Sequence, residues 1–324
     1  MCRRCQGLVD AIDRYIAKAD DELADSLEIE GYEIPKKTLK YAKSIEDEVA
    51  EILLDETDLF VAKMSESIDL EDYIEKVWPG VALTDQTAAK VCEVFIEELQ
   101  EFMPEAVSAY ISKTDKALKL ERVSNRTVSW IESWSTELGN LMQLNSQTQI
   151  ENILKKGLAN GESTVTVARN ILTSGIRDEY YKARRVAVTE MLRAHSVAQQ
   201  EAYMQSPVVV QKRWRHTGSY KNQPRQNHVD MDGQTVDKSE PYTLIGIKGG
   251  TYYPMYPRDT NLPPEESINC HCLSQSVTDP KIVGLTAEEK AELQAEALAE
   301  MDDEWEKELD AYYERMQRGN DNED

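Results

Sequence analysis

Two short segments of the chain contain residue types that could bind a metal ion. One covers residues 228–233, His-Val-Asp-Met-Asp-Gly, and the other covers residues 269–272, Asn-Cys-His-Cys. Thiolate and imidazole are ligands that zinc prefers, and a structural zinc site takes four of them. The candidate ligands of such a site are His228, Cys270 and Cys272, with His216, Asp232 or His271 as the fourth.

The same residues are compatible with arrangements other than structural zinc. Cys-x-Cys is not the usual Cys-x-x-Cys spacing, so Cys270 and Cys272 could be small buried hydrophobic side chains while His228 hydrogen-bonds a turn. Alternatively, His228 with Asp230 and Asp232 could support metal-assisted hydrolysis, which needs an open metal position and a nearby base. The sequence has no Gly-x-Ser-x-Gly, His-Glu-x-x-His or glycine-rich phosphate loop, so we expect no enzyme.

A Cys-x-x-Cys pair, Cys2 and Cys5, stands near the start of the chain. Together with Cys270 and Cys272 it could close a four-thiolate site if the N-terminus folded back, but no βαβ pattern indicates a thioredoxin-like role. The start has no apolar signal region, and no uncharged run has the length of a membrane span. We therefore expect a protein made in the cytoplasm, where thiols stay reduced.

The formal net charge of -23 argues against general nucleic-acid binding, because phosphate affinity comes from Lys and Arg. The charge is uneven, however. Residues 181–225 contain nine Lys or Arg and two Glu, whereas residues 287–324 contain fifteen acids and four bases. Basic residues near Trp214 and Tyr220 are candidate DNA contacts, namely Lys212, Arg213, Arg215, Lys221 and Arg225. Pairing of these cations with acidic side chains is the favoured alternative.

Hydrophobic periodicity divides the chain into three regions. Apolar residues at helical spacing run through residues 1–180, with Ser163 as a cap and Gly175 as a helix stop. Residues 181–278 begin with a helix over 184–203 and continue with β-like runs and turn signals. Residues 279–324 predict an acidic, partly disordered helical tail, which begins with Thr286 and Glu289 at capping-box spacing. The expected fold class is α+β: a helical docking arm, a small loop-rich α+β domain and the tail.

Three blocks within residues 184–272 resemble the phage Mu protein F-like minor head proteins, also called the head-morphogenesis family. Residues 185–190, Arg-Val-Ala-Val-Thr-Glu, resemble the first block. Trp214 and residues 224–233 resemble the second block, and residues 256–272, ending Asn-Cys-His-Cys, resemble the third. His271 stands where the family usually has Arg. Arg258 and Thr260 replace what are often Gly and Pro.

The resemblance implies a low-copy structural protein of the virion, without catalytic activity. Such proteins lie inside the head near the portal and aid assembly, DNA packaging or DNA delivery, so portal protein, other head proteins and packaged DNA are the implied partners. The motif positions that carry over, without assigned roles, are Arg185, Thr189, Glu190, Trp214, His228, Asp232, Gly233, Asn269, Cys270 and Cys272. Gly233 is expected to take a positive φ in a tight turn after Asp232.

Overall fold

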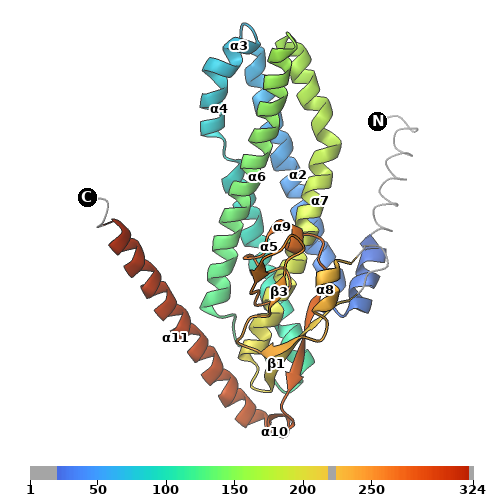
Figure 1. Ribbon diagram of the computed structural model, residues 1–324, viewed down its shortest axis with the longest axis vertical. Helices are drawn as coiled ribbons and strands as arrows, with labels where there is room; N and C mark the ends of the chain where they lie inside the picture. Colours follow the sequence, from blue (N-terminus) through green and yellow to red (C-terminus); the bar gives the residue numbers. More distant parts are fainter. Residues whose placement is uncertain (1–19, 218–223, 321–324) are drawn as a thin grey trace. The chain divides into compact units, whose positions relative to one another are not determined.

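The computed structural model describes residues 20–217 and 224–320, with the backbone alone over residues 174–181 and 312–320 (Figure 1). Residues 20–30 are helical. The larger helices that follow are α2 (Pro35–Ser65), α5 (Thr87–Thr114), α6 (Asn125–Ala159), α7 (Thr164–Gln205) and α11 (Ala287–Asn320). Among the described residues, no helix combines the length and the apolar character that crossing a membrane requires.

The chain forms two compact units, each assembled from separate stretches. The helical unit consists of Lys40–Gln100 and Trp130–Glu190. The sheet unit consists of Met1–Leu39, Glu101–Ser129 and Met191–Asp324. The expected division at residue 180 therefore falls inside α7, and part of the N-terminal half belongs to the same unit as the strands. The expected α+β class, mainly helical at first and then with small sheets, is confirmed.

The helical unit has its own hydrophobic core. Its long helices α2, α6 and α7 run beside one another, together with α3 (Leu70–Asp72), the π-helical turn η1 (Tyr73–Val77) and α4 (Trp78–Thr84) (Figure 1). Phe60 from α2 packs edge-on against Trp78, and Ile150 and Leu154 from α6 meet Val167 from α7 in the same cluster. The apolar stripes of the sequence are thus core contacts, as their spacing indicates.

The sheet unit contains a three-stranded antiparallel sheet in the order β2-β1-β5. The strands are β1 (Val209–Arg215), β2 (Thr235–Asp237) and β5 (Leu273–Thr278), and a separate hairpin is formed by β3 (Leu244–Ile245) and β4 (Thr251–Tyr252). Short helices α8 (Gln226–Asp230), α9 (Pro264–Ser267) and α10 (Pro280–Val283) occupy the connections. Many short elements joined by turns leave little apolar area to hold this region together.

The C-terminal part of α7 packs against the sheet. The side chain of Gln199 accepts a hydrogen bond from the backbone N–H of Ser274 on β5 (3.0 Å), and the Tyr203 hydroxyl donates to the carbonyl of Ser274 (3.2 Å). Gln200 accepts from the Lys212 ammonium on the central strand (3.0 Å). Polar side chains in the C-terminal part of a single helix therefore fix the strands that position the candidate site.

Most local signals in the sequence are found where they were expected. Ser163 caps α7 by accepting from the backbone N–H of Thr166 (3.3 Å), and Thr286 and Glu289 form the reciprocal capping box of α11 (2.9 and 3.2 Å). The predicted stop at Gly175 is wrong, since α7 continues through this residue to Gln205. Glycine lowers helix propensity by only about 1 kcal/mol, which tertiary packing readily outweighs.

Candidate metal centre

His228, Cys270 and Cys272 converge from two segments of the sheet unit. The short helix α8 presents His228, which lies edge-on to Trp214 on β1 with ring centroids 5.8 Å apart. Both cysteines lie just before β5, after a turn in which Asn269 takes a φ of 56°. Asparagine tolerates this left-handed conformation better than most residues, so the turn explains why Asn suits position 269.

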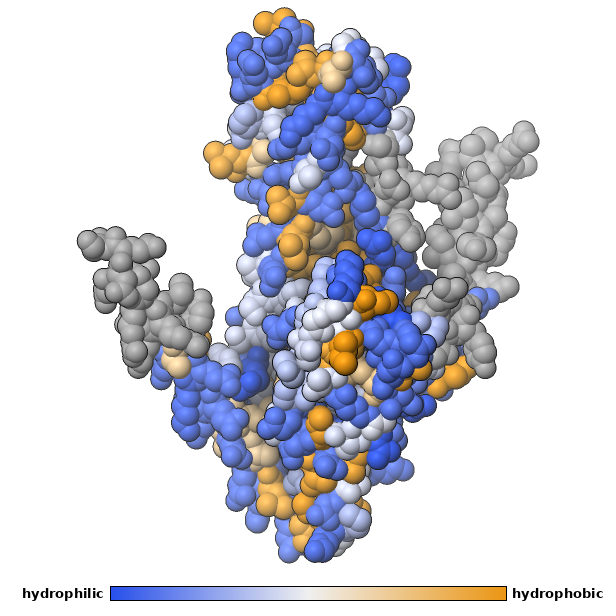
Figure 2. Space-filling model, viewed as in Figure 1, coloured by the Kyte–Doolittle hydropathy of each residue, from blue (hydrophilic) through white to orange (hydrophobic). Residues whose placement is uncertain are grey.

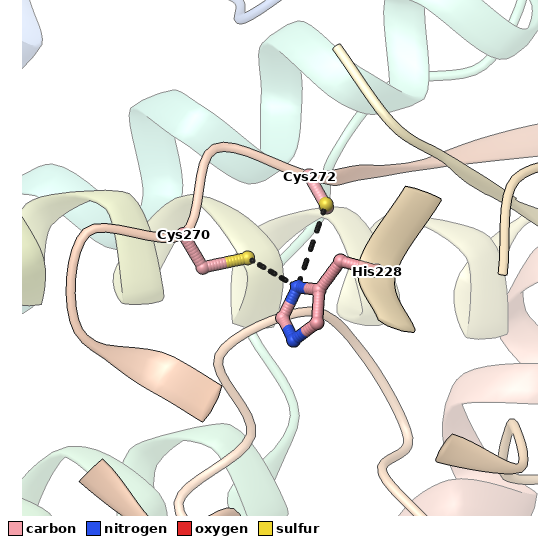
Figure 3. Close-up of side chains that lie close together, drawn as sticks. All are labelled: His228, Cys270 and Cys272. Carbon is pink, nitrogen blue, oxygen red and sulfur yellow. Dashed lines mark hydrogen bonds between the residues drawn. The ribbon is translucent and has the colours of Figure 1, made fainter. Parts of the chain in front are cut away.

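The three side chains lie within metal-binding reach of one another. The Nδ1 atom of His228 is 3.5 Å from the Cys270 sulfur and 3.8 Å from the Cys272 sulfur (Figure 3). All three residues are buried, with at most 3% of their surface exposed. The three ligand atoms all lie within 4.8 Å of one another. The sequence-based expectation that these residues come together is consistent with this geometry, and zinc binding itself stays a prediction.

A buried carboxylate orients the imidazole of His228. Glu266 in α9 contacts Nε2 of His228 at 2.9 Å and also accepts hydrogen bonds from the backbone N–H of Ile247 (2.7 Å) and the amide of Asn227 (3.0 Å). Burial acts to raise the pKa of Glu266, but these hydrogen bonds outweigh it and lower the pKa. The Glu266 carboxylate thereby fixes the orientation of the ring, with Nδ1 facing the two sulfurs.

His216 adjoins the cluster from the end of β1. Its Nδ1 atom is 3.6 Å from the Cys272 sulfur. Asp232, another candidate ligand, does not join the sulfurs. Its carboxylate accepts a hydrogen bond from the backbone N–H of His216 (2.8 Å). Asp232 therefore positions His216 beside the cluster. Gly233 next to it has a φ of 85°, which confirms the expected tight turn.

His271 faces away from the two cysteines that flank it. Its Nδ1 atom contacts the Glu30 carboxylate at 2.8 Å, and its carbonyl accepts from the hydroxyls of Tyr32 (3.1 Å) and Thr217 (2.8 Å). Alternate residues in an extended segment project to opposite sides, so Cys270 and Cys272 share one side while His271 takes the other. The expectation that His271 adds a metal ligand is therefore wrong for this geometry.

Arg258 is a fully buried residue of the site that the sequence analysis did not single out. Its guanidinium donates to the carbonyls of Cys270 (2.6 Å), Cys272 (3.0 Å) and Leu192 (2.9 Å) and to the hydroxyl of Ser196 (2.6 Å). These bonds tie the Cys-x-Cys segment to α7. The one sequence signal was the departure of Arg258 from the small residue that the resemblance predicts at this position.

The surroundings of the two thiols shift their pKa values in opposite directions. The pKa of Cys270 is well below its usual value, chiefly because Cys272 hydrogen-bonds to it, with His228 and the Arg258 charge acting in the same direction against burial. The pKa of Cys272 is raised by its bond to Cys270 and by burial, and the Trp214 indole opposes that shift. The cluster therefore stabilises one thiolate readily, which is the form of cysteine that binds metals.

The basic candidates that the structure describes differ in their exposure. Arg213 and Arg215 are exposed on β1. Lys212, on the same strand, is fully buried. The Lys212 ammonium donates to the carbonyl of Met255 (2.7 Å) as well as to Gln200, and burial lowers its pKa to about 7. Lys212 is therefore not available to contact DNA, which corrects the sequence-based expectation.

The remaining candidate residues of the sequence lie outside the cluster of His228 and the two cysteines, or outside the described residues. Arg225 is half-buried and donates to the carbonyl of Ile268, beside the cluster. Lys221, Cys2 and Cys5 lie outside the described residues. In the helical unit, Thr189 and Glu190 of the first motif block are buried. Glu190 accepts from the indole of Trp134 on α6 at 2.7 Å.

Arg185, the remaining residue of that block, is exposed and lines a cavity of about 300 Å³ between helices of the helical unit. Its place beside the cavity comes from the packing of α2, α6 and α7, since residues of all three helices line the same space. Arg185 therefore lies beside a cavity of the helical unit.

Comparison with known proteins identifies the family. The family described as phage Mu protein F like protein matches residues 148–275, which contain all three motif blocks. The uncharacterized protein YqbB of Bacillus subtilis is 34% identical over 304 residues, covering 91% of this chain and 98% of YqbB. The NAD(+)–arginine ADP-ribosyltransferase EFV of Enterococcus faecalis is 29% identical over 163 residues, covering 48% of this chain and 30% of that enzyme. No solved structure matches significantly. The chain belongs to the phage Mu protein F-like family.

Proposed function

We propose that this protein is a minor head protein of a tailed phage or prophage that lies inside the head near the portal. There it aids head assembly and the packaging or delivery of DNA. Family membership supports a head-morphogenesis role. The observation that carries the proposal beyond the family is that the cysteines and histidine of the motif are buried and hydrogen-bonded into the fold. Such residues hold a domain together.

Catalysis is the less favoured function. A metal-dependent hydrolase or nuclease needs a ligand position open to substrate, whereas His228, Cys270 and Cys272 are at most 3% exposed. Glu266 already engages the far nitrogen of His228 and two further donors, so it is not free to act as a base. The match to the transferase covers 30% of that enzyme and supports a shared segment more than a shared reaction.

The helical unit supplies the docking surface in this proposal. Several large apolar side chains of this unit are exposed, including Leu141 (49%) and Leu144 (63%), which lie three residues apart on α6. Figure 2 shows apolar side chains among mainly hydrophilic ones on the visible face of the molecule. Exposed apolar side chains close together are a common feature of protein interaction sites.

Purified heads test the proposal. We expect the protein in virions at low copy number and bound to portal protein when the two are co-expressed. The double variant Leu141→Lys, Leu144→Lys should lower the amount bound by at least about tenfold, since losing apolar contact worth about 1.4 kcal/mol has that effect. Ile247→Lys, at a 58% exposed position of the sheet unit, is the matched control. Absence from heads together with no portal binding would refute the proposed function.

A further inference from the structure

We propose that His216, His228, Cys270 and Cys272 together bind one zinc ion, with His216 as the fourth ligand. The site is structural: it connects the residue after β1, the helix α8 and the segment just before β5 within the sheet unit. The proposal does not depend on the head function, because it concerns how this chain holds its own fold.

The separations match those of a tetrahedral zinc site. Zinc–sulfur bonds of about 2.3 Å and zinc–nitrogen bonds of about 2.1 Å at tetrahedral angles place sulfur and nitrogen about 3.6 Å apart. The three sulfur–nitrogen separations here are 3.5 Å and 3.8 Å for His228 and 3.6 Å for His216. A zinc ion thus fits between these atoms with little movement of His228 and the cysteines.

His216 is the best placed of the three candidates for the fourth position. His271 is turned to Glu30, and Asp232 is engaged by the backbone N–H of His216. His216 instead directs its Nδ1 atom at a cysteine sulfur that already belongs to the cluster. Asp232 fixes the backbone of His216 just after a paired strand, beside the other three ligands.

The surroundings suit a buried ion of this charge. Zinc binding would release the two thiol protons to solvent, and a zinc ion with two thiolates and two neutral imidazoles carries no net charge. Glu266 on the outer nitrogen of His228 is the carboxylate partner that zinc-bound histidines usually have. The Arg258 guanidinium binds the carbonyls of both cysteines and thus holds the Cys-x-Cys spacing.

The closed Cys₂His₂ set distinguishes this site from a catalytic one. Catalytic zinc sites keep three protein ligands and leave the fourth position to water, whereas structural sites are filled by the protein. If His216 binds the ion, no position remains for a reacting water. The identity of the fourth ligand therefore decides between the structural site and a metal-dependent hydrolase.

Metal analysis of the intact, purified chain tests the site directly. We expect one zinc per chain by native mass spectrometry and elemental analysis. After chelator treatment, Co²⁺ should bind with equal stoichiometry, give the visible absorption of a tetrahedral ion and a thiolate-to-cobalt charge-transfer band, and be displaced by Zn²⁺. Each of Cys270→Ser and Cys272→Ser should reduce the charge-transfer band by about half or abolish binding.

Two histidine variants identify the fourth ligand. His216→Ala should keep the charge-transfer band but weaken zinc binding and change the visible cobalt spectrum. His216→Cys should restore tight binding with a stronger charge-transfer band. His271→Ala is the control, because its side chain adjoins the same cysteines and binds Glu30. Lack of stoichiometric zinc and cobalt binding by the unmodified chain overturns the site. Wild-type metal affinity and spectrum in His216→Ala overturn the ligand assignment.

Discussion

Arg258 stabilises the sheet unit through charge-assisted hydrogen bonds in its interior. It is fully buried and donates to three carbonyls and one hydroxyl. Removing such a group leaves its buried acceptors unpaired, at a cost of about 1–3 kcal/mol each. We expect Arg258→Ala to lower the free energy of unfolding by at least about 3 kcal/mol in denaturant titrations. Arg258→Lys should rescue little, because an ammonium lacks the planar fork of donors. Arg215→Ala, at an exposed position, is the control.

The burial of His195 should make the stability of the sheet unit depend on pH. It is fully buried between Thr38 (2.6 Å from Nε2) and Tyr110 (3.1 Å from Nδ1), and burial, aided by the Arg258 charge, lowers its pKa from 6.5 to about 3. The unfolded chain therefore binds a proton between pH 6.5 and pH 3 that the folded chain excludes. Stability falls as the pH drops through this range, with a slope of up to about 1.4 kcal/mol per pH unit from this residue.

The comparison of wild type with His195→Gln isolates that contribution. In thermal unfolding experiments, the free energy of unfolding should fall less between pH 6.5 and pH 5 in the variant than in wild type. The variant nevertheless starts from a lower stability. Equal slopes would show that folding does not change proton binding by His195, which would contradict its lowered pKa. Carboxylates titrate in both proteins, so the difference between the slopes is the quantity to measure.

The helix α11 is an integral part of the sheet unit, although its acidic composition predicts a solvated tail. Lys290 pairs with Asp115 at 2.6 Å, and both side chains are largely buried. Asp302 pairs with Arg122 and also accepts from the backbone N–H of Asn125 (2.9 Å), where α6 begins. Asp302 of α11 thereby caps the start of α6.

Asp302→Ala should destabilise this contact. Loss of a helix cap costs about 0.5–2 kcal/mol, and the Arg122 pair is lost with it. We expect faster hydrogen exchange at the start of α6 and along α11, with a lower melting temperature. Asp303→Ala changes the next, exposed acid and should leave both measurements within about 0.5 kcal/mol of wild type. Identical exchange in the two variants would contradict the capping role.

Strand periodicity explains which site residues were predictable. Lys212, Arg213 and Arg215 were grouped as basic neighbours, but side chains of a strand alternate between faces, so Lys212 lies opposite the two arginines. Cys270 and Cys272 were predictable as a pair for the same reason. Arg258 and Glu266 were not, because only the folded loops bring them to the cysteines and to His228.

At the scale of the whole molecule, charge argues for weak DNA binding. The net charge is -23, and Lys212 is withdrawn from the basic segment. We expect DNA binding to be undetectable at about 150 mM salt, and binding at low salt to fall with a shallow slope, because Arg213, Arg215 and Arg225 offer few phosphate contacts. Fluorescence anisotropy over a salt series measures this, with Arg213→Ala, Arg215→Ala as the comparison. Tight, salt-resistant binding would contradict it.

The discontinuity of the sheet unit has a consequence for biosynthesis. Residues up to Glu190 contain every stretch of the helical unit, so this unit is complete before β1 leaves the ribosome. The stretches around Tyr32 and Tyr110 can pack only after late residues such as His271 and Asp302 have been synthesised. The contact between Tyr32 and His271 closes a loop of more than two hundred residues. The sheet unit therefore completes its folding only after its late segments have left the ribosome, and its early segments stay unpaired in the nascent chain until then.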